Sequence, residues 1–161
     1  MISLSNVKTN AMRILDSKNI KYNIITYNHR DNKVDGISVA KKIDKAPEQV
    51  YKTLVTQGKG GDIYVFLIPV DEELDLKKAA KAVKEKKIDM ISVNDIKKHT
   101  GYIRGGCSPI GMKKDYPTFI DNSAVNLDNI IISGGKIGVQ IELALEDLKE
   151  ITKAKLCELE K

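Results

Sequence analysis

The stretches Val50-Tyr-Lys-Thr-Leu-Val-Thr56 and Ile63-Tyr-Val-Phe-Leu-Ile-Pro-Val70 decide the fold of this chain, because both are apolar enough to enter a core. The second is the clearest strand candidate, since a short continuous apolar run bounded by turn residues is typical of a buried strand. Between them, Gly58-Lys-Gly-Gly61 has the composition of a tight turn. The pattern therefore predicts a hairpin that enters the core.

Helix and strand patterns alternate on both sides of this hairpin. Before it, we expect a helix over residues 7–18 capped by Ser5 or Asn6, a strand over 22–27, a helix over 36–43 and a helical turn that starts at Pro47. After it, we expect a helix over 75–86, a strand over 90–93, a helical turn over 94–99, strands over 118–120, 129–133 and 138–143, and a helix over 145–151.

This order predicts a single α+β domain over residues 1–161, with a large mixed β-sheet core surrounded by helices. Residues 152–161 read as a charged tail. The length of 161 residues suits one domain. The sequence contains neither an internal repeat nor a segment with the composition of a linker.

Composition restricts the classes of function. The chain is 42% hydrophobic and 30% charged, as in globular proteins, and it has no apolar run long enough to cross a membrane and no signal-peptide pattern, so we expect no membrane association and a cytoplasmic location. Cys107 and Cys157 lack metal or disulfide spacing, so neither a zinc site nor a disulfide is expected. We also expect no cofactor. The net charge of +5 favours an anionic partner, although a lysine-rich helix face such as Lys77–Lys87 is usually just solvated.

The segment Tyr102-Ile-Arg-Gly-Gly-Cys-Ser-Pro-Ile-Gly-Met-Lys-Lys114 contains three glycines, a proline and an arginine within eight positions. Glycines let backbone amides approach a ligand closely, and proline fixes a bend. Arg104 is one of only three arginines among 27 basic residues, which suggests a need for its planar set of donors. A structural turn with an incidental arginine is the alternative reading of the same pattern.

The usual catalytic motifs are missing from this segment. Met112 separates the glycine from the lysine of a P-loop, so nucleotide hydrolysis is excluded. Ser108 does not lie in a nucleophile elbow, and only His29 and His99 are available as its base. A cysteine such as Cys107 is more often a small buried residue than a nucleophile. Lys52 interrupts an apolar run, so its ammonium either extends to the solvent or faces a wet cavity.

Several motifs, in order from about residue 7 to about residue 150, resemble those of the YbaK/EbsC family. They are Lys8-Thr-Asn-Ala11, Glu48-Gln-Val-Tyr-Lys-Thr-Leu-Val55, Ile68-Pro-Val70, Glu73-Leu-Asp-Leu-Lys-Lys-Ala-Ala-Lys-Ala-Val83, Tyr102-Ile-Arg-Gly-Gly-Cys-Ser-Pro-Ile-Gly111 and Ser133-Gly-Gly-Lys136. The members of this family are free-standing Cys-tRNA(Pro)/Cys-tRNA(Cys) deacylases, related to the editing domain of bacterial prolyl-tRNA synthetases. Their fold is an α+β domain around a large mixed sheet, which agrees with the element order above.

The resemblance implies hydrolysis of the ester that joins cysteine to the 3′ end of mischarged tRNA. The family's invariant lysine matches Lys52, and its Gly-x-x-x-Pro loop matches Gly105–Pro109. The expected catalytic residues are therefore Lys52, Gly105 and Gly106. The expected substrate-binding residues are Tyr27, Thr53, Arg104, Cys107, Ser108, Pro109, Ser133 and Gly134. Gln140 departs from relatives that carry an acidic residue there, which leaves the role of this position open.

Such an enzyme needs no nucleophile of its own if the substrate's cysteine thiol attacks the ester carbonyl. The protein then only positions the ester and stabilises the oxyanion with Lys52 and loop amides. The implied partners are the aminoacylated tRNA end and prolyl-tRNA synthetase, and we expect a monomer. The alternative is a non-catalytic module of the same fold that binds charged tRNA or a synthetase; retention of Lys52 and the complete loop favours the enzyme.

Overall fold

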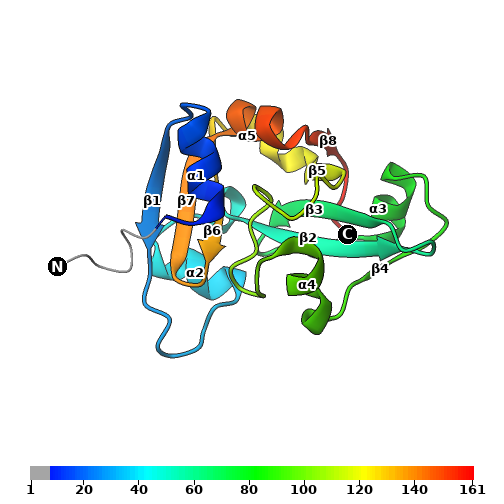
Figure 1. Cartoon of the computed structure of the whole chain (residues 1–161), viewed down its shortest axis with the longest axis horizontal. Coiled ribbons are helices and arrows are strands. Elements are labelled where there is room, and N and C mark those ends of the chain that lie inside the picture. The colour runs from blue at the N-terminus through cyan, green and yellow to red at the C-terminus, as the bar shows by residue number, and fades with distance from the viewer. Residues whose placement is uncertain (1–7) are drawn as a thin grey trace.

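The computed structural model describes residues 8–161 of the chain (Figure 1). Its α-helices are α1 (Asn10–Ser17), α2 (Gly36–Lys42), α3 (Leu76–Ala82), α4 (Val93–Thr100) and α5 (Leu145–Thr152), and its 3₁₀ helices are η2 (Pro47–Gln49) and η3 (Asn122–Asn126). Its strands are β1 (Tyr22–Thr26), β2 (Tyr51–Gly58), β3 (Ile63–Pro69), β4 (Ile88–Met90), β5 (Thr118–Asp121), β6 (Asn129–Lys136), β7 (Val139–Ala144) and β8 (Lys155–Cys157).

The strands form two sheets, and the α+β class predicted from the sequence is confirmed. The larger sheet has the order β4-β2-β3-β5-β8 and is mixed, because β2 pairs antiparallel with β3 and β4 whereas β5 runs parallel to β3 and β8. The smaller sheet, β1-β7-β6, is antiparallel. A single bridge between Val50 and Ile131 connects the start of β2 with β6, so the two sheets meet at this point.

The predicted hairpin forms the centre of the larger sheet. In β3, Val65 and Leu67 pack into one buried cluster together with α1 and β6, while Phe66 and Ile68 pack into a second cluster beside α3. Because both faces of β3 are covered, its sequence is apolar at successive positions instead of alternating with polar residues.

Four expectations from the sequence differ from the structure. The first helix starts at Asn10 and is capped by Thr9, whose hydroxyl accepts a hydrogen bond from the amide of Met12; Ser5 and Asn6 lie outside the described residues. The helix expected over 75–86 ends at Ala82, and the strand expected over 90–93 occupies Ile88–Met90. Residues 152–161 are not a free tail, because they contain β8 and the fully buried Leu159.

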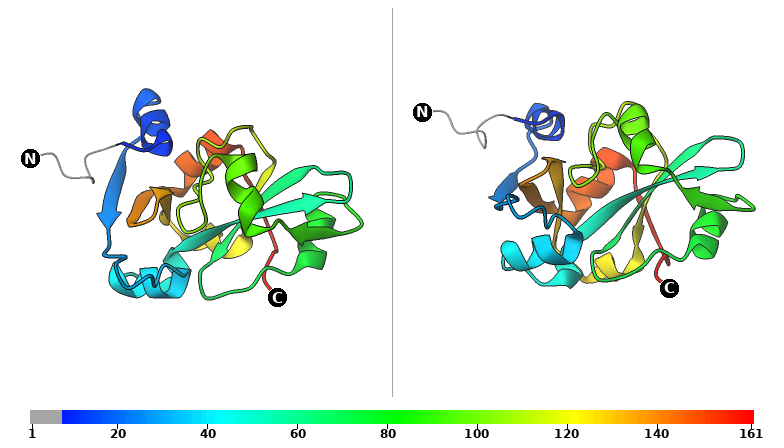
Figure 2. Two further views of the ribbon diagram at one scale, coloured as in Figure 1. Left: turned by 60° about the horizontal axis from the view of Figure 1, so that its bottom comes forward. Right: turned by 90° about the horizontal axis from the view of Figure 1, so that it is seen from below.

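The smaller sheet, with α1 and α2, lies at one end of the molecule, and α3 and β4 lie at the other end (Figure 1). The β2–β3 hairpin extends between these ends, and the segment after α4 folds back beside the start of β2 (Figure 2). The candidate site is surrounded by the junction of the two sheets, by α2 and by the segment after α4. Among the described residues, no helix is long and apolar enough to span a membrane.

Candidate active site

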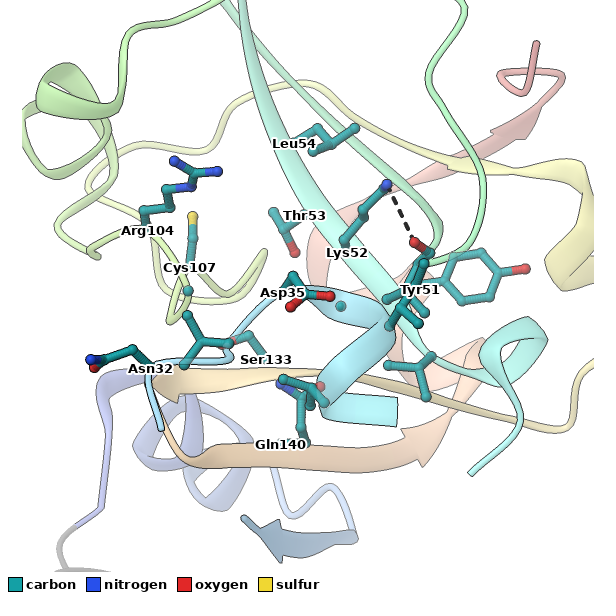
Figure 3. A pocket seen from close by; sticks show the side chains of 17 residues that line it. Asn32, Asp35, Tyr51, Lys52, Thr53, Leu54, Arg104, Cys107, Ser133 and Gln140 are labelled. Atoms are coloured by element: carbon teal, nitrogen blue, oxygen red, sulfur yellow. Dashed lines mark hydrogen bonds between the residues drawn. The ribbon is translucent and has the colours of Figure 1, made fainter. Parts of the chain in front are cut away.

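A cavity of about 770 Å³ opens at the junction of the two sheets. Its lining comes from the start of β2, Val70 after β3, the segment that leads into α2 together with α2 itself, the glycine-rich loop after α4, and the facing strands β6 and β7 (Figure 3). This volume lies within the range of small-molecule sites. Six of the residues expected from the sequence line the cavity, namely Lys52, Thr53, Arg104, Gly105, Cys107 and Ser133.

Lys52 reaches the cavity from β2, where its backbone pairs with Ile68. Its ammonium lies 3.5 Å from the carbonyl oxygen of Val70, at the limit of a hydrogen bond. Burial lowers the pKa of this ammonium, although the nearby carboxylates of Glu73 and Asp71 act in the opposite direction. The side chain therefore faces the wet cavity, and its proton is held less firmly than that of an ordinary lysine.

Thr53 and Ser133 add hydroxyl groups to the cavity wall. The hydroxyl oxygen of Thr53 is buried and has no hydrogen-bond partner within residues 8–161. The hydroxyl oxygen of Ser133 accepts a hydrogen bond, 3.2 Å long, from the amide of Gly135 in the same strand. A buried hydroxyl without a partner is unfavourable in a folded protein, so its position at a cavity indicates a polar ligand.

The glycine-rich loop places its two central glycines differently. Gly105 lines the cavity in a backbone conformation with φ of +87°, which side chains other than glycine rarely adopt. The amide of Gly106 instead donates a hydrogen bond to the carbonyl oxygen of Ile103, and its Cα faces the backbone of Lys136 and Ile137. In this loop conformation the amide of Gly105 has no hydrogen-bond partner within residues 8–161, whereas that of Gly106 is bonded within the loop.

Hydrogen bonds from the loop's own residues hold it in place. The hydroxyl of Tyr102 donates to the carbonyl oxygen of Ile110 at 2.6 Å, which ties the start of the loop to its end. The hydroxyl of Thr100, at the end of α4, donates to the carbonyl oxygen of Ile96 and accepts from the amide of Tyr102. These hydrogen bonds fix the loop before any ligand binds.

Neither candidate nucleophile of the loop is suited to attack an ester. Burial raises the pKa of the Cys107 thiol to about 11, so the thiol stays protonated near neutral pH. Ser108 is completely buried, and its hydroxyl oxygen accepts a hydrogen bond from the amide of Ile110. Neither His29 nor His99 lines the cavity. The cavity thus lacks an activated side-chain nucleophile among the residues described.

Five expected site residues are not part of the cavity lining, namely Tyr27, Gly106, Ser108, Pro109 and Gly134. Tyr27 is buried under α2, its hydroxyl has no partner among residues 8–161, and the Lys42 ammonium lies 5.9 Å from the centre of its ring. Gly134 is buried against Val139, whose side chain a Cβ at this position would meet at 2.8 Å.

The sequence does not predict two polar residues of the lining, Asn32 and Asp35, and it leaves a third, Gln140, without a role. Asp35 is the N-cap of α2, and its carboxylate accepts hydrogen bonds from both the amide and the hydroxyl of Ser38. An aspartate directly before a helical pattern predicts a cap, but nothing in the local sequence shows that the cap faces a cavity. No group of metal-binding residues occurs in the described part of the chain.

Comparisons with known proteins agree with this arrangement. The sequence profile of the aminoacyl-tRNA editing domain matches residues 33–151, which include every residue that lines the cavity except Asn32. The chain is 42% identical over 152 residues to EbsC of Enterococcus faecalis, to which Cys-tRNA(Pro)/Cys-tRNA(Cys) deacylase activity has been attributed; the match covers 94% of this chain and 93% of EbsC.

Two further comparisons show lower sequence identity. A proline–tRNA ligase of Kosmotoga olearia is 29% identical over 100 residues, which are 62% of this chain and 17% of the ligase. A crystal structure attributed to a trans-editing enzyme for prolyl-tRNA synthetase superposes with a TM-score of 0.82 at 21% identity, covers 96% of this chain and 99% of that one, and shows the same fold. The protein belongs to the aminoacyl-tRNA editing domain family.

Proposed function

We propose that this protein removes cysteine from mischarged tRNA(Pro) by cleaving the ester between the amino acid and the 3′-terminal adenosine. The observation that carries the proposal is a cavity with a half-buried lysine, a fixed glycine loop and no activated nucleophile among its described lining residues. Such a site suits a substrate that brings its own nucleophile. The similarity to EbsC over nearly the whole chain supports the same substrate class.

In the proposed reaction, the deprotonated thiol of the bound cysteine attacks its own ester carbonyl. A cysteine thiol has an ordinary pKa of about 8.5, so a few per cent is thiolate at neutral pH. The new carbon–sulfur bond forms as the ester carbon–oxygen bond breaks, and the 3′ oxygen of the tRNA leaves with a proton from the solvent. Water then hydrolyses the cyclic thioester to free cysteine.

The protein contributes position and charge to this reaction. Lys52 and the amide of Gly105 donate hydrogen bonds to the developing oxyanion. The amide of Gly105 is available for this because it has no partner within residues 8–161. Thr53, Ser133 and Arg104 bind polar groups of the substrate. Cys107 forms part of the wall, while Tyr27, Gly106, Ser108, Pro109 and Gly134 hold that wall in shape. The protein acts in trans as a cytoplasmic monomer, with prolyl-tRNA synthetase as a partner that supplies the charged tRNA.

A deacylation time course on four charged forms of tRNA(Pro) tests the proposal. We expect rapid loss of cysteine, and much slower loss of serine, alanine and proline, because a hydroxyl is far less ionised than a thiol and the other two side chains have no nucleophile. Cys107→Ala and Ser108→Ala are the matched controls and should keep most of the activity. Rapid release of serine, or an inactive but folded Cys107→Ala variant, would restore a protein nucleophile. Binding of the charged tRNA without turnover would instead favour a non-catalytic module.

A further inference from the structure

The cavity contains one carboxylate among its described lining residues, that of Asp35, together with the cationic side chains of Lys52 and Arg104. Asp35 ends the segment that leads into α2, and its side chain lies between those of Thr53 and Gln140 (Figure 3). The proposed reaction assigns no role to this negative charge.

The carboxylate of Asp35 is held in place with part of its bonding capacity unused. One oxygen accepts from the hydroxyl of Ser38 at 2.7 Å, and the other accepts from the amide of Ser38 at 3.1 Å. These hydrogen bonds lower the pKa of Asp35, so the group is ionised at neutral pH. A carboxylate has about four acceptor positions, and none of the ion pairs among residues 8–161 involves Asp35.

Two other polar groups of the same cavity lack protein partners, which is independent support for a polar ligand next to Asp35. The side chain of Gln140 is only 7% exposed, and it makes no hydrogen bond with any residue from 8 to 161. The hydroxyl of Thr53 is likewise buried and unpaired within the described chain. Buried polar groups in native proteins are almost always satisfied, so the Thr53 hydroxyl indicates where a ligand supplies the missing partner, and the unpaired amide of Gln140 adds a second polar group to the same wall.

We propose that Asp35 binds the α-ammonium group of the aminoacyl ester, so that the cavity selects substrates whose amino group is free. This inference rests on the proposed function. The α-ammonium is the cationic group at the 3′ end of a cysteinyl-tRNA, and it is attached to the carbon next to the ester carbonyl. With the ammonium held at Asp35 and the carbonyl oxygen held at Lys52 and Gly105, two substituents of this carbon are fixed. The direction of the third, the thiol-bearing side chain, is then determined.

A consequence is that N-blocked tRNAs are rejected. N-acylation removes the positive charge and adds bulk beside Asp35, which leaves this carboxylate without a partner when the substrate is bound. Hydrogen bonds to charged groups contribute enough for about a 10- to 100-fold preference. The site would thus leave peptidyl-tRNA and formylated initiator tRNA intact, while it accepts an aminoacyl-tRNA with a free amino group.

The first test compares Cys-tRNA(Pro) with N-acetyl-Cys-tRNA(Pro), and divides each kcat/KM by the spontaneous hydrolysis rate of the same ester. We expect the wild type to prefer the free amine by about 10- to 100-fold. Asp35→Asn should lose most of this preference by losing rate on Cys-tRNA(Pro), and it should fold, because asparagine caps helices as well as aspartate. The matched control is Asp31→Asn, which removes an exposed carboxylate of the same segment that pairs with Lys42 outside the cavity.

The second test measures binding of a stable analogue in which an amide replaces the ester, 3′-cysteinylamino-3′-deoxyadenosine, and of its N-acetyl derivative by calorimetry. The ammonium site is supported if the wild type binds the free amine more tightly than the N-acetyl derivative and Asp35→Asn loses this preference. If this result is obtained but no turnover occurs, only the hydrolase proposal fails. An active wild type that treats both esters alike overturns the ammonium site alone. An Asp35→Asn variant that keeps the full preference overturns it as well.

Discussion

At the scale of single residues, protonated Lys52 destabilises the folded protein, and its proposed role in the reaction explains why a lysine is present there. Burial lowers the pKa of its ammonium from the ordinary value of 10.5. The native state therefore binds this proton less firmly than the unfolded chain does, and stability rises with pH between the lowered pKa and 10.5. Below this window the protonated lysine destabilises the fold, and above it the penalty disappears.

Replacing Lys52 with methionine separates the two effects. We expect Lys52→Met to slow single-turnover deacylation of Cys-tRNA(Pro) by about 10²-fold or more, as when an oxyanion donor is removed. We also expect it to resist urea better than the wild type at pH 7, with a smaller advantage at pH 10, because the buried charge is gone. Urea midpoints at both pH values and the rate are measured on the same preparation. A destabilised variant with full activity would contradict both roles.

At the scale of elements, the packing of the glycine-rich loop against the β6–β7 hairpin positions the cavity wall. A Cβ at Gly106 would lie 2.8 Å from backbone atoms of both Lys136 and Ile137, which cannot move aside as a flexible side chain can. We expect Gly106→Ala to lower the free energy of unfolding by about 1–3 kcal/mol through overpacking and to reduce deacylation. The measurement is chemical unfolding together with the rate.

Gly60 provides the matched control for that substitution. It lies in the β2–β3 turn, where a Cβ would have no neighbour within 4 Å. Gly60→Ala should therefore change stability by no more than about 0.5 kcal/mol and leave the rate unchanged. Equal effects at the two glycines would show that close packing of the loop is not what makes Gly106 necessary.

The C-terminal segment packs against β5, and the contribution of this contact to the stability of the protein should depend on pH. Asp121, at the end of β5, accepts hydrogen bonds from the amides of Leu159 and Glu160. The side-chain hydrogen bond with Asp121 raises the pKa of Glu160 from 4.5 to about 7. Between pH 4.5 and about 7, the folded state therefore holds a proton on Glu160 that the unfolded chain has lost. The Asp121–Glu160 pair contributes less stability as the pH rises through this range.

Substituting Glu160 with glutamine should remove this dependence. The amide of glutamine still donates to Asp121 but acquires no charge at high pH. We expect the urea midpoint of the wild type to fall, relative to that of Glu160→Gln, between pH 5 and pH 7.5. Aspartates whose pKa is lowered, such as Asp16 and Asp75, titrate below 3.8 and do not contribute in this range. Parallel pH profiles for the two proteins would mean that the carboxyl pair does not share a proton.

The sequence predicts those elements whose signal is local. The β2–β3 hairpin, β7 and α5 follow apolar runs and helical periodicity, and they form within one or two residues of the expected ranges. In contrast, β8 is not predicted, because three residues with a charged first position carry no strand pattern and its parallel pairing with β5 depends on residues distant in sequence. The same reason applies to the cavity: Lys52 and Gly105 are expected from motifs, but Asp35 shows only a capping signal.

At the scale of the whole molecule, two groups of lysines are candidates for binding the tRNA body. One lies on α3, with exposed Lys77, Lys78 and Lys81, at the end of the molecule away from the smaller sheet (Figure 1). The other lies at the end of α4, with exposed Lys97 and Lys98, directly before the loop that carries Arg104. Lys113 joins this second group, since its ammonium donates to the carbonyl oxygen of Lys98.

Entry of the 3′ end into the cavity favours the α4 group, because the phosphates next to the terminal adenosine must pass close to the cavity rim. We expect the double variant Lys97→Glu/Lys98→Glu to raise KM for Cys-tRNA(Pro) and to reduce the slope of log affinity against log salt by about one for each phosphate that the variant no longer neutralises. The same variant should cleave cysteinyl-adenosine, which has no tRNA body, at the wild-type rate. Lys77→Glu/Lys81→Glu carries the same change of charge on α3 and should affect KM less. If the α3 variant instead shows the larger increase, the acceptor arm crosses the hairpin toward β4, and the approach to the cavity is from the opposite side.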